Sequence, residues 1–476
     1  MVDMEERKTN IWNAAQALAS DKGGEIPKDM RRELLDEVTN LVEYPTSIMG
    51  TFKEDFLKLP KEILVTVMKK HQRYFPVEDV ERDQLLPVFV TVANGEMDEK
   101  TVRGGNEAVL TARFEDADFF YKLDMQKKLS DFRPLLSGTM FQKDLGTMLD
   151  KADRTDKLIA PLAKAMNLSH VEEIASKASH LSRADLASSV VTEFTALAGI
   201  LGKHYALKDG LTLDVAEAIF ESVLPRNASD IVPKTEAGII VAVTDRLDSL
   251  VGLVAAGCTP TASADPYGLR RIANGMLQTL IQNKVNLDLK QAIAAAAEIQ
   301  PIDVESEQCD EAHDFVVKRL EQLLIEDDAP REVIRSVLAE RNSDPYLAVV
   351  TVKELAELYT TEDFAAVLAS YSRPTRIVSG KDVDMEWKVD ESVFQQQEEK
   401  ELWDAYKAVK NELTDAFGVK TFVEASKVLE APLESFFNSV FVMDEDDTIR
   451  KNRLAMMRDI ATLPRGLLDF KSLPNF

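Results

Sequence analysis

Residues 235–257 read TEAGIIVAVTDRLDSLVGLVAAG, and apolar side chains recur through this stretch at every third or fourth position. Because one turn of an α-helix takes between three and four residues, that spacing places them on one side of a helix. Pro233 precedes the stretch and Gly257 closes it, as helix ends commonly require. The stretch therefore predicts a long helix.

The same texture extends along most of the chain. From about residue 126 onward, strand-like runs nearly vanish, and helical stretches are separated by Gly, Pro and Asp. We expect a helical domain at 140–295, a helical connecting region at 296–372 and final helices at 393–476. The polar stretch SRPTRIVSGKDVDMEWKVDES, which starts at residue 372, predicts a partly extended linker at 373–392.

The N-terminal part has a different pattern. Residues 10–42 show helical spacing, whereas residues 44–125 contain β-branched runs bounded by Pro and Gly, such as LPVFVTVANG at 86–95. These features predict an α+β region at 1–130. The expected fold class is mainly α and multi-domain, with an N-terminal α+β portion.

Charge is unevenly distributed. The 476 residues exceed what a single core accommodates, and the formal net charge is -25. Residues 301–450 hold 16 basic against 35 acidic side chains, whereas the last 26 residues hold 5 against 2. This balance argues against indiscriminate wrapping of nucleic acid, but a local basic patch can still bind a specific one.

Cysteine usage and hydropathy restrict the setting. Cys258 and Cys309 are the only cysteines, and they lack the spacing of a metal site. No apolar run approaches the roughly 20 residues of a membrane span, and the start MVDMEERKTNIWNAAQ lacks the features of a signal peptide. We expect a protein of a reducing compartment without a membrane span.

One basic cluster lies in the N-terminal region, at residues 69–77, KKHQRYFPV. On a strand, His71, Arg73 and Phe75 would share one face, because alternate residues point the same way. Arg and an aromatic ring together suit contact with a phosphate and a base. The alternative is an amphipathic strand with an ordinary solvated face.

A second cluster lies in the helical domain and consists of Asp185, His204, Asp245 and Asp248. Phosphohydrolases of the HD type hold a divalent metal with an adjacent His-Asp pair and a later Asp. Here Ala184 stands where that pair requires His. We therefore expect no working metal site, and interhelical or surface ion pairs are the simpler interpretation.

Tandem arginines occur in SADPYGLRRIANGML, residues 263–277. Asp265 is suited to cap a helix, with Pro266 at its first position. Arg270 and Arg271 would follow in the first turns, and their planar guanidinium groups suit bidentate binding of phosphate or carboxylate. Pairing with acidic side chains of the same domain is an equally good interpretation.

The last basic stretch is DEDDTIRKNRLAMMRDIATL, residues 444–463. Acidic residues before and at the start favour a helix through its dipole. Leu454, Met457 and Leu463 would form its apolar face, which leaves the basic residues Arg450, Lys451 and Arg453 largely outward. A plain charged helix face is the alternative.

Motifs of common active sites are absent. The sequence contains no Gly-rich phosphate loop, no G-x-S-x-G elbow, no H-E-x-x-H pair and no adenylate-forming core. From the residues alone, the chain reads as a mostly helical binding protein without an active site of its own.

Together these stretches resemble the β subunit of bacterial-type glycyl-tRNA synthetases. The resemblance runs in order through KKHQRYFPV, LPVFVTVANG, GGNEAVLTARFEDADFF, FQKDLGTMLDKADR, EFTALAGILGKHYA, TDRLDSLVGL, DPYGLRRIANGML and IRKNRLAMM. AAGCTP, GKDVD and FFNSVFVMDED resemble the plant and algal organellar version, in which α and β regions are fused. Because the family's β region begins well before residue 1, the chain resembles its C-terminal two thirds.

The resemblance implies a division of labour between two parts of an ATP-dependent glycine–tRNA ligase. An α subunit, or a fused α region, would bind ATP, Mg and glycine and carry the catalytic site, so no catalytic residue and no cofactor is expected here. Residues 1–130 would end a B3/B4-like region, 140–295 would be a degenerate HD-like domain, and 393–476 would be a helical anticodon-binding domain.

The partners implied are tRNA(Gly) and the α part, in an α2β2-type assembly or a fused dimer. The tRNA-binding candidates are His71, Arg73, Arg270, Arg271, Arg450, Lys451, Asn452 and Arg453, with Asn452 as a reader of anticodon bases. A fused enzyme would work in a chloroplast or mitochondrion, and a bacterial one in the cytoplasm. An HD-type metal phosphohydrolase and a free-standing tRNA-binding module are the alternatives.

Overall fold

The structure is a computed structural model that describes residues 3–31, 34–79, 81–82, 84–379, 384–413, 417–474 and 476. The chain packs as two compact units. Unit 1 comprises Met1–Asp156, Val171–Leu224 and Thr235–Val241, and unit 2 comprises Lys157–His170, Pro225–Lys234 and Ala242–Phe476. The expected fold class, mainly α with an N-terminal α+β portion, is confirmed. The five predicted domain ranges stay a prediction.

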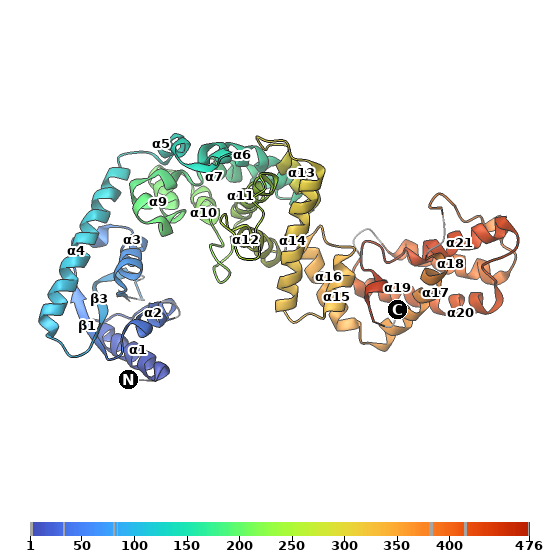
Figure 1. Cartoon of the computed structure of the whole chain (residues 1–476), viewed down its shortest axis with the longest axis horizontal. Helices are drawn as coiled ribbons and strands as arrows, with labels where there is room; N and C mark the ends of the chain where they lie inside the picture. The colour runs from blue at the N-terminus through green and yellow to red at the C-terminus, as the bar shows by residue number, and fades with distance from the viewer. Residues whose placement is uncertain are drawn as a thin grey trace. The chain divides into compact units, whose positions relative to one another are not determined.

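Unit 1 is built on a three-stranded antiparallel sheet of β1 (Pro45–Thr51), β3 (Gln84–Asn94) and β2 (Phe75–Asp79), with β3 in the centre. Helices α1 (Met4–Ser20) and α4 (Glu99–Asp124) pack against β1 (Figure 1). Apolar residues of α1 and the sheet, such as Ile11, Phe75 and Val90, are at most 1% exposed and form the core. Burial of this apolar surface drives the association of helix and sheet.

Smaller elements complete this unit. The helices are η1 (Lys28–Arg31), α2 (Leu34–Leu41), η2 (Glu54–Lys58), α3 (Lys61–Thr66), η3 (Val67–Gln72), α5 (Leu129–Phe132), η4 (Arg133–Gly138), α7 (Glu172–Leu181), η6 (Ala184–Ala187), α8 (Ser189–Glu193), η7 (Thr195–Leu197), α9 (Ile200–Lys208) and α10 (Leu213–Glu221). A short antiparallel pair joins β4 (Met140–Gln142) to β5 (Gly146–Thr147). The division between the units falls within α6 (Met148–Ala165), η5 (Ser169–Val171) and α11 (Glu236–Ala255).

The strand expected for residues 69–75 is wrong for most of its length. Residues Val67–Gln72 form a π-helical turn that continues α3, and Arg73 ends it in the left-handed conformation, with φ 58°. Only at Phe75 does β2 begin. The buried side chains of Ile63, Leu64, Val67 and Met68 recur at helical spacing, so packing of that face outweighs the β-branched content of the segment.

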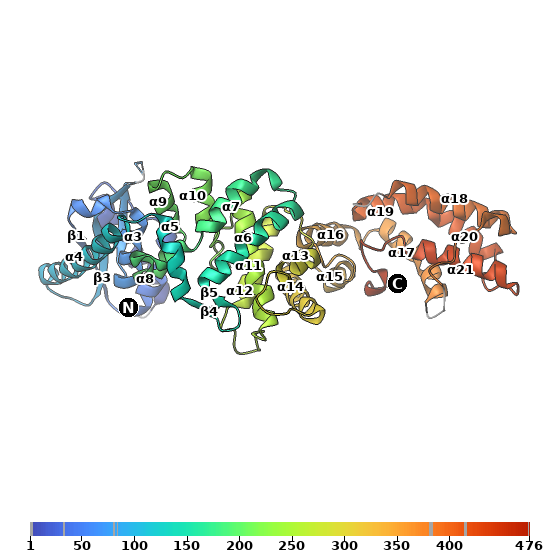
Figure 2. The same ribbon diagram turned by 90° about the horizontal axis from the view of Figure 1, so that it is seen from above.

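Unit 2 is helical in its described part. It contains α12 (Leu269–Gln282), α13 (Leu289–Ala297), α14 (Ser306–Glu326), α15 (Arg331–Leu338), α16 (Pro345–Leu358), α17 (Glu362–Val378), η8 (Glu391–Val393), α18 (Gln397–Glu412), α19 (Val419–Ser426), η9 (Lys427–Leu429), α20 (Glu430–Ser439), α21 (Asp447–Ala461) and η10 (Phe470–Ser472). Helix α17 packs against α20 and α21, and α18 packs against α20 (Figure 2). Rings of Phe364, Tyr371, Phe422 and Phe470 cluster in this bundle.

The stretch 373–392, predicted as a linker, is partly helical. Residues 373–378 form the last part of α17, with Pro374 inside the helix. A proline normally disfavours a helix interior, but Tyr371 and Pro374 are buried, and this packing extends the helix to Val378. Residues 384–390 lack regular structure, as expected, whereas residues 380–383 of the predicted linker lie outside the described residues.

No helix in the described part of the chain combines the length and the apolar character needed to cross a membrane.

Candidate nucleic-acid interface

Helix α21 carries the basic residues that the sequence placed on its outer face. Asp446 caps the helix, since its carboxylate accepts the backbone N–H groups of Thr448 and Ile449 at 2.7 and 3.3 Å. Every residue from Asn452 to Arg458 is nevertheless buried. The helix therefore lies inside the bundle of unit 2 and presents only part of its first turns to solvent.

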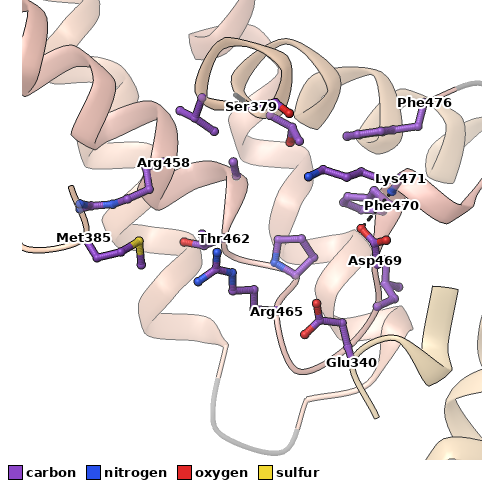
Figure 3. A pocket seen from close by; sticks show the side chains of 15 residues that line it. Glu340, Ser379, Met385, Arg458, Thr462, Arg465, Asp469, Phe470, Lys471 and Phe476 are labelled. Atoms are coloured by element: carbon purple, nitrogen blue, oxygen red, sulfur yellow. Dashed lines mark hydrogen bonds between the residues drawn. The ribbon is translucent and has the colours of Figure 1, made fainter. Parts of the chain in front are cut away.

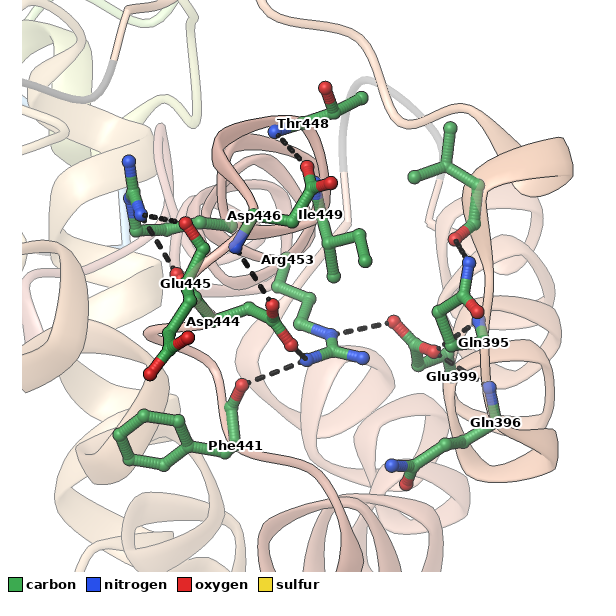
Figure 4. Close-up of polar contacts among 12 residues, drawn as sticks. Gln395, Gln396, Glu399, Phe441, Asp444, Glu445, Asp446, Thr448, Ile449 and Arg453 are labelled. Carbon is green, nitrogen blue, oxygen red and sulfur yellow. Dashed lines mark hydrogen bonds and ion pairs between the residues drawn. The ribbon is translucent and has the colours of Figure 1, made fainter.

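Arg453 points into the protein, so the expectation that it faces outward is wrong. Its side chain is 3% exposed, and its Nε donates to Glu399 Oε1 at 2.8 Å. Its Nη1 donates to the carbonyl of Phe441 and to Asp444 Oδ2, each at 2.9 Å (Figure 4). Two carboxylates and a carbonyl thus compensate the desolvated guanidinium group, which explains how a buried charge is tolerated here.

Asn452 also has internal partners. It is 6% exposed; its Oδ1 accepts the N–H of Asp390 at 2.7 Å, and its Nδ2 donates to the Asp390 carbonyl at 3.1 Å. Both ends of the amide are therefore engaged by one backbone residue. Because only 6% of Asn452 is exposed, little of the amide is accessible to a base, which argues against the expected role of Asn452.

Arg450 and Lys451 remain accessible, as expected. The Arg450 side chain is 30% exposed, pairs with Asp447 and donates to the Asp444 carbonyl at 2.8 Å. The Lys451 side chain is 49% exposed and lies 2.8 Å from Asp447. Its hydrogen bond lowers the pKa of the Asp447 carboxyl. The Lys451 Nζ also lies 5.7 Å from the centre of the Trp387 ring, a cation–π distance.

Beside Lys451, aromatic and lysine side chains line a hollow of about 340 Å³. Residues 384–390 and α18 supply most of them. The partly exposed ring of Trp403 stacks on the ring of Tyr406, which is 5% exposed, with centroids 4.6 Å apart and 14° between their planes. We call the following residues the aromatic–lysine surface: Trp387, Lys388, Trp403, Tyr406, Lys407, Lys410 and Lys451.

The side chains of this surface are held in fixed orientations. Glu391 Oε1 accepts hydrogen bonds from Trp403 Nε1 at 3.1 Å and from Lys407 Nζ at 2.9 Å. Together with Asp404, this contact raises the pKa of Lys407, which therefore stays cationic. Burial raises the pKa of Tyr406, so its phenol stays neutral. Planar rings beside ammonium groups are suited to stacking unpaired bases and binding their phosphates.

This surface is not among the sites expected from the sequence, although a signal for it exists. Residues 403–410 read WDAYKAVK, in which Trp403, Tyr406, Lys407 and Lys410 recur at intervals of three and four. That spacing puts them on one face of a helix. The contribution of residues 384–390 has no such signal, because it depends on contacts between segments distant in the sequence.

The other basic candidates lie in other parts of the chain. The His71 ring meets Phe194 edge-on, with centroids 5.3 Å apart, and Arg73 Nε lies 2.6 Å from Glu37 Oε1. Both belong to unit 1. The ion pair of Arg73 is roughly half exposed, so its side chain is reachable from solvent.

The tandem arginines open α12 in unit 2. The helix begins at Leu269 with Gly268 as its N-cap, so Pro266 is not its first residue. Asp265 still caps it, because its carboxylate accepts the N–H groups of Leu269 and Arg270 at 2.8 and 3.0 Å. Arg270 donates to the Thr261 carbonyl at 2.5 Å. Arg271 is exposed and makes no hydrogen bond or ion pair with any described residue.

The acidic residues of the HD-like cluster have structural contacts. Asp185 is 1% exposed, accepts the N–H groups of Gly199 and Gly202 at 2.6 and 3.0 Å, and has its pKa raised by burial. His204 Nε2 lies 3.1 Å from Glu62, and this hydrogen bond lowers the pKa of the Glu62 carboxyl. These contacts stabilise local structure.

The later aspartates of the cluster are also inside the protein. Asp245 and Asp248 are 8% and 0% exposed, and Gln300 donates to Asp248 at 3.2 Å. The surface position considered for them is therefore wrong. In the part of the chain that the structure describes, no group of three or more His, Cys, Asp or Glu is arranged to hold a metal ion.

Comparisons with known proteins agree along the whole chain. The family model described as "Glycyl-tRNA synthetase beta subunit" matches residues 1–339, and "DALR anticodon binding domain" matches residues 367–468. The second match contains the whole aromatic–lysine surface.

Two relatives illustrate the similarity. "Glycine--tRNA ligase, chloroplastic/mitochondrial 2" of Arabidopsis thaliana is 47% identical over 100% of this chain and 44% of its own length. "Glycine--tRNA ligase beta subunit" of Moorella thermoacetica is 36% identical over 99% of this chain and 69% of its own length. The chain thus spans less than half of the first relative and about two thirds of the second.

Proposed function

The chain belongs to the glycyl-tRNA synthetase beta subunit family, and from this premise we propose that it is the tRNA-binding part of a glycine–tRNA ligase. One observation carries the proposal: the segment that matches an anticodon-binding domain has the partly exposed rings of Trp387 and Trp403 beside lysine side chains. Unpaired anticodon bases require both features, namely a flat stacking face and a cation for the phosphate.

In this proposal the chain contributes binding and the chemistry occurs elsewhere. An α subunit or fused α region would bind ATP and Mg and form the activated glycine, and we assign no catalytic residue to this chain. By holding tRNA(Gly) in a fixed position relative to that site, the chain would accelerate the transfer of glycine to the tRNA. The translational and rotational entropy of the tRNA would already be lost on binding, before the reaction. The assembly would be of the α2β2 type or a fused dimer.

We propose the aromatic–lysine surface as the main contact with the anticodon arm, with Arg450 at its border. His71, Arg73, Arg270 and Arg271 stay as proposed contacts with other parts of the tRNA or with the α part. Asn452 and Arg453 are assigned structural roles instead, because both are buried and hydrogen-bonded.

The proposed location follows the relatives. The Arabidopsis relative is named as chloroplastic/mitochondrial and is more similar to this chain than the bacterial beta subunit of Moorella. This favours an organelle and a fused α region; the bacterial arrangement would instead place the protein in the cytoplasm. No specific observation favours an HD-type phosphohydrolase or a free-standing module.

Retention of tRNA(Gly) on filters at two salt concentrations tests the proposal. The test variant changes Lys388, Lys407, Lys410 and Lys451 to Ala. A matched control changes four exposed lysines of the same unit, namely Lys290, Lys318, Lys353 and Lys420, and alters the net charge equally. We expect the test variant to bind at least about 10-fold more weakly and with a shallower salt dependence, because phosphate contacts are lost.

The control should bind like the wild type. Failure of the folded wild type to retain tRNA(Gly) would contradict the proposed function. Equal losses in the test and control variants would contradict the placement of the site.

A further inference from the structure

Residues 384–390, called the presenting segment below, belong to the predicted linker, precede η8 and lack regular secondary structure. They supply Trp387 and Lys388 to the aromatic–lysine surface. Within the segment, Asp384 accepts the backbone N–H groups of Glu386 and Trp387 at 2.9 and 3.3 Å. Without a helix or a strand ladder, its other backbone groups need water or partners from elsewhere, and α21 supplies several of these partners.

Two buried side chains of α21 hold the presenting segment by its backbone. Arg458 donates from Nη1 to the carbonyl of Asp384 and from Nη2 to the carbonyl of Trp387, each at 2.7 Å. Asn452 accepts from the N–H of Asp390 at 2.7 Å and donates to its carbonyl at 3.1 Å. Figure 3 shows Arg458 pointing toward the part of the chain that carries Met385. Both ends and the middle of the segment are thus fixed.

The chemistry of these contacts is specific to the residue types. A guanidinium group presents several N–H donors in one rigid plane, so a single Arg side chain can bridge two carbonyls, which the point charge of Lys does not reproduce. An amide that pairs with both backbone groups of one residue acts like a neighbouring strand. Arg458 and Asn452 are 8% and 6% exposed. Arg458 lines the hollow, but its guanidinium N–H groups are already donated to the two carbonyls and to Asp459.

Trp387 is the aromatic residue that these contacts place. Its ring is partly exposed beside the hollow, and Lys451 Nζ lies 5.7 Å from the ring centre. The indole N–H of Trp403 is used by Glu391, but that of Trp387 has no hydrogen-bond partner among the described residues. Trp387 therefore offers a stacking face, a neighbouring cation and an unused donor.

We propose, on the basis of the tRNA-binding role above, that Asn452 and Arg458 are positioning residues that fix Trp387 as a platform for one unpaired nucleobase. The ligand class is a single-stranded RNA nucleotide. The base stacks on the indole, and its phosphate lies within reach of Lys451. Because the segment is already ordered, binding does not have to order it, and affinity rises accordingly.

A double-mutant cycle on the affinity for tRNA(Gly) tests this proposal in the full chain. The variants are Trp387→Ala, Arg458→Lys and the two combined. We expect Trp387→Ala to weaken binding about 10-fold, in line with the loss of one stacked base. Arg458→Lys should weaken binding in the wild type but add nothing once Trp387 is absent, because it acts through that ring.

Arg453→Lys serves as the matched control. It alters another buried arginine of α21, which donates hydrogen bonds to Glu399, Phe441 and Asp444 and not to the presenting segment. Any general loosening of the bundle would appear in this variant too. Its effect on affinity should be small and should add to that of Trp387→Ala.

A second readout needs no RNA. With Trp12 and Trp403 changed to Phe, Trp387 is the only tryptophan, and its fluorescence anisotropy reports how firmly the ring is held. Arg458→Lys and Asn452→Ala should lower the anisotropy, whereas Arg453→Lys should leave it unchanged.

The outcomes separate the two proposals. If the wild type binds tRNA(Gly) but Trp387→Ala binds equally well, the platform is wrong while the tRNA-binding function stands. Strict additivity of Trp387→Ala and Arg458→Lys, or unchanged anisotropy, would overturn the positioning role. A folded wild type that binds no tRNA would refute the proposed function and this inference together.

Discussion

Arg453 illustrates what a single charged residue can and cannot reveal in a sequence. Its helical spacing from Arg450 and Lys451 suggested a shared outer face, yet its side chain is 3% exposed. What decides its direction is Glu399, 54 positions away in the chain and itself 1% exposed, together with Asp444 (Figure 4). Partners so distant in sequence leave no local signal.

Removing the Arg453 side chain should be strongly destabilising. Arg453→Ala would leave the Glu399 carboxylate buried without its cation, which costs about 3–5 kcal/mol of the free energy of unfolding. Urea unfolding followed by circular dichroism measures the change.

Arg450→Ala is the matched control for that experiment. It lies one turn earlier on the same helix, but its side chain is 30% exposed and its ion pair with Asp447 is at the surface. Its loss should cost at most about 1 kcal/mol. Equal stabilities of the two variants would show that the buried cluster around Arg453 does not hold the bundle together.

At the level of elements, helices with regular apolar spacing were predictable and irregular segments were not. The stretch at 235–257 contains α11, and residues 444–463 contain α21, both as expected. The structure of the segment at 69–75 was not predictable, because a π-helical turn has no sequence signature of its own. Helix α18 could have revealed half of the candidate site through its spacing, but the presenting segment could not.

The π-helical turn ends at Arg73 in a backbone conformation that residues other than glycine seldom adopt. Substitutions at this position should therefore rank by their tolerance of positive φ. Arg73→Gly and Arg73→Asn should unfold at nearly the wild-type urea concentration, since only a half-exposed ion pair with Glu37 is lost. Arg73→Val should be less stable than either by about 1–2 kcal/mol, because its β-branched side chain clashes there.

The comparison among the three variants removes the effect of the charge, which all of them lose equally. A valine variant as stable as the glycine variant would mean that residue 73 is not held in the left-handed conformation.

For the whole molecule, the charge balance of -25 and the proposed RNA-binding role are compatible because cations are used in two ways. Arg453 and Arg458 are buried, where they hold together acidic side chains and backbone carbonyls. Exposed lysines of the aromatic–lysine surface lie beside aromatic rings. Amino-acid composition could predict neither the burial of these arginines nor the exposure of these lysines, because it counts charges without regard to burial.

Fold class and family were accessible from the sequence, since they rest on periodicity and on motifs spread over the chain. The candidate site was accessible only in part. Arg450 and Lys451 are accessible, as their helical spacing predicted. Trp387 belongs to the site because Arg458 donates a hydrogen bond to its carbonyl, and no sequence pattern predicts that contact.

Acetylation of lysines tests directly whether tRNA(Gly) contacts the aromatic–lysine surface. The full chain is acetylated with and without tRNA(Gly), and the labelled lysines are identified by mass spectrometry. Because this footprint needs no mutation, it separates contact from stability. We expect bound tRNA to protect Lys388, Lys407, Lys410 and Lys451 from acetylation. Lys318 and Lys353 of the same unit should be acetylated as in the free protein. Unchanged labelling of the first four lysines in a complex that demonstrably contains tRNA(Gly) would contradict this expectation.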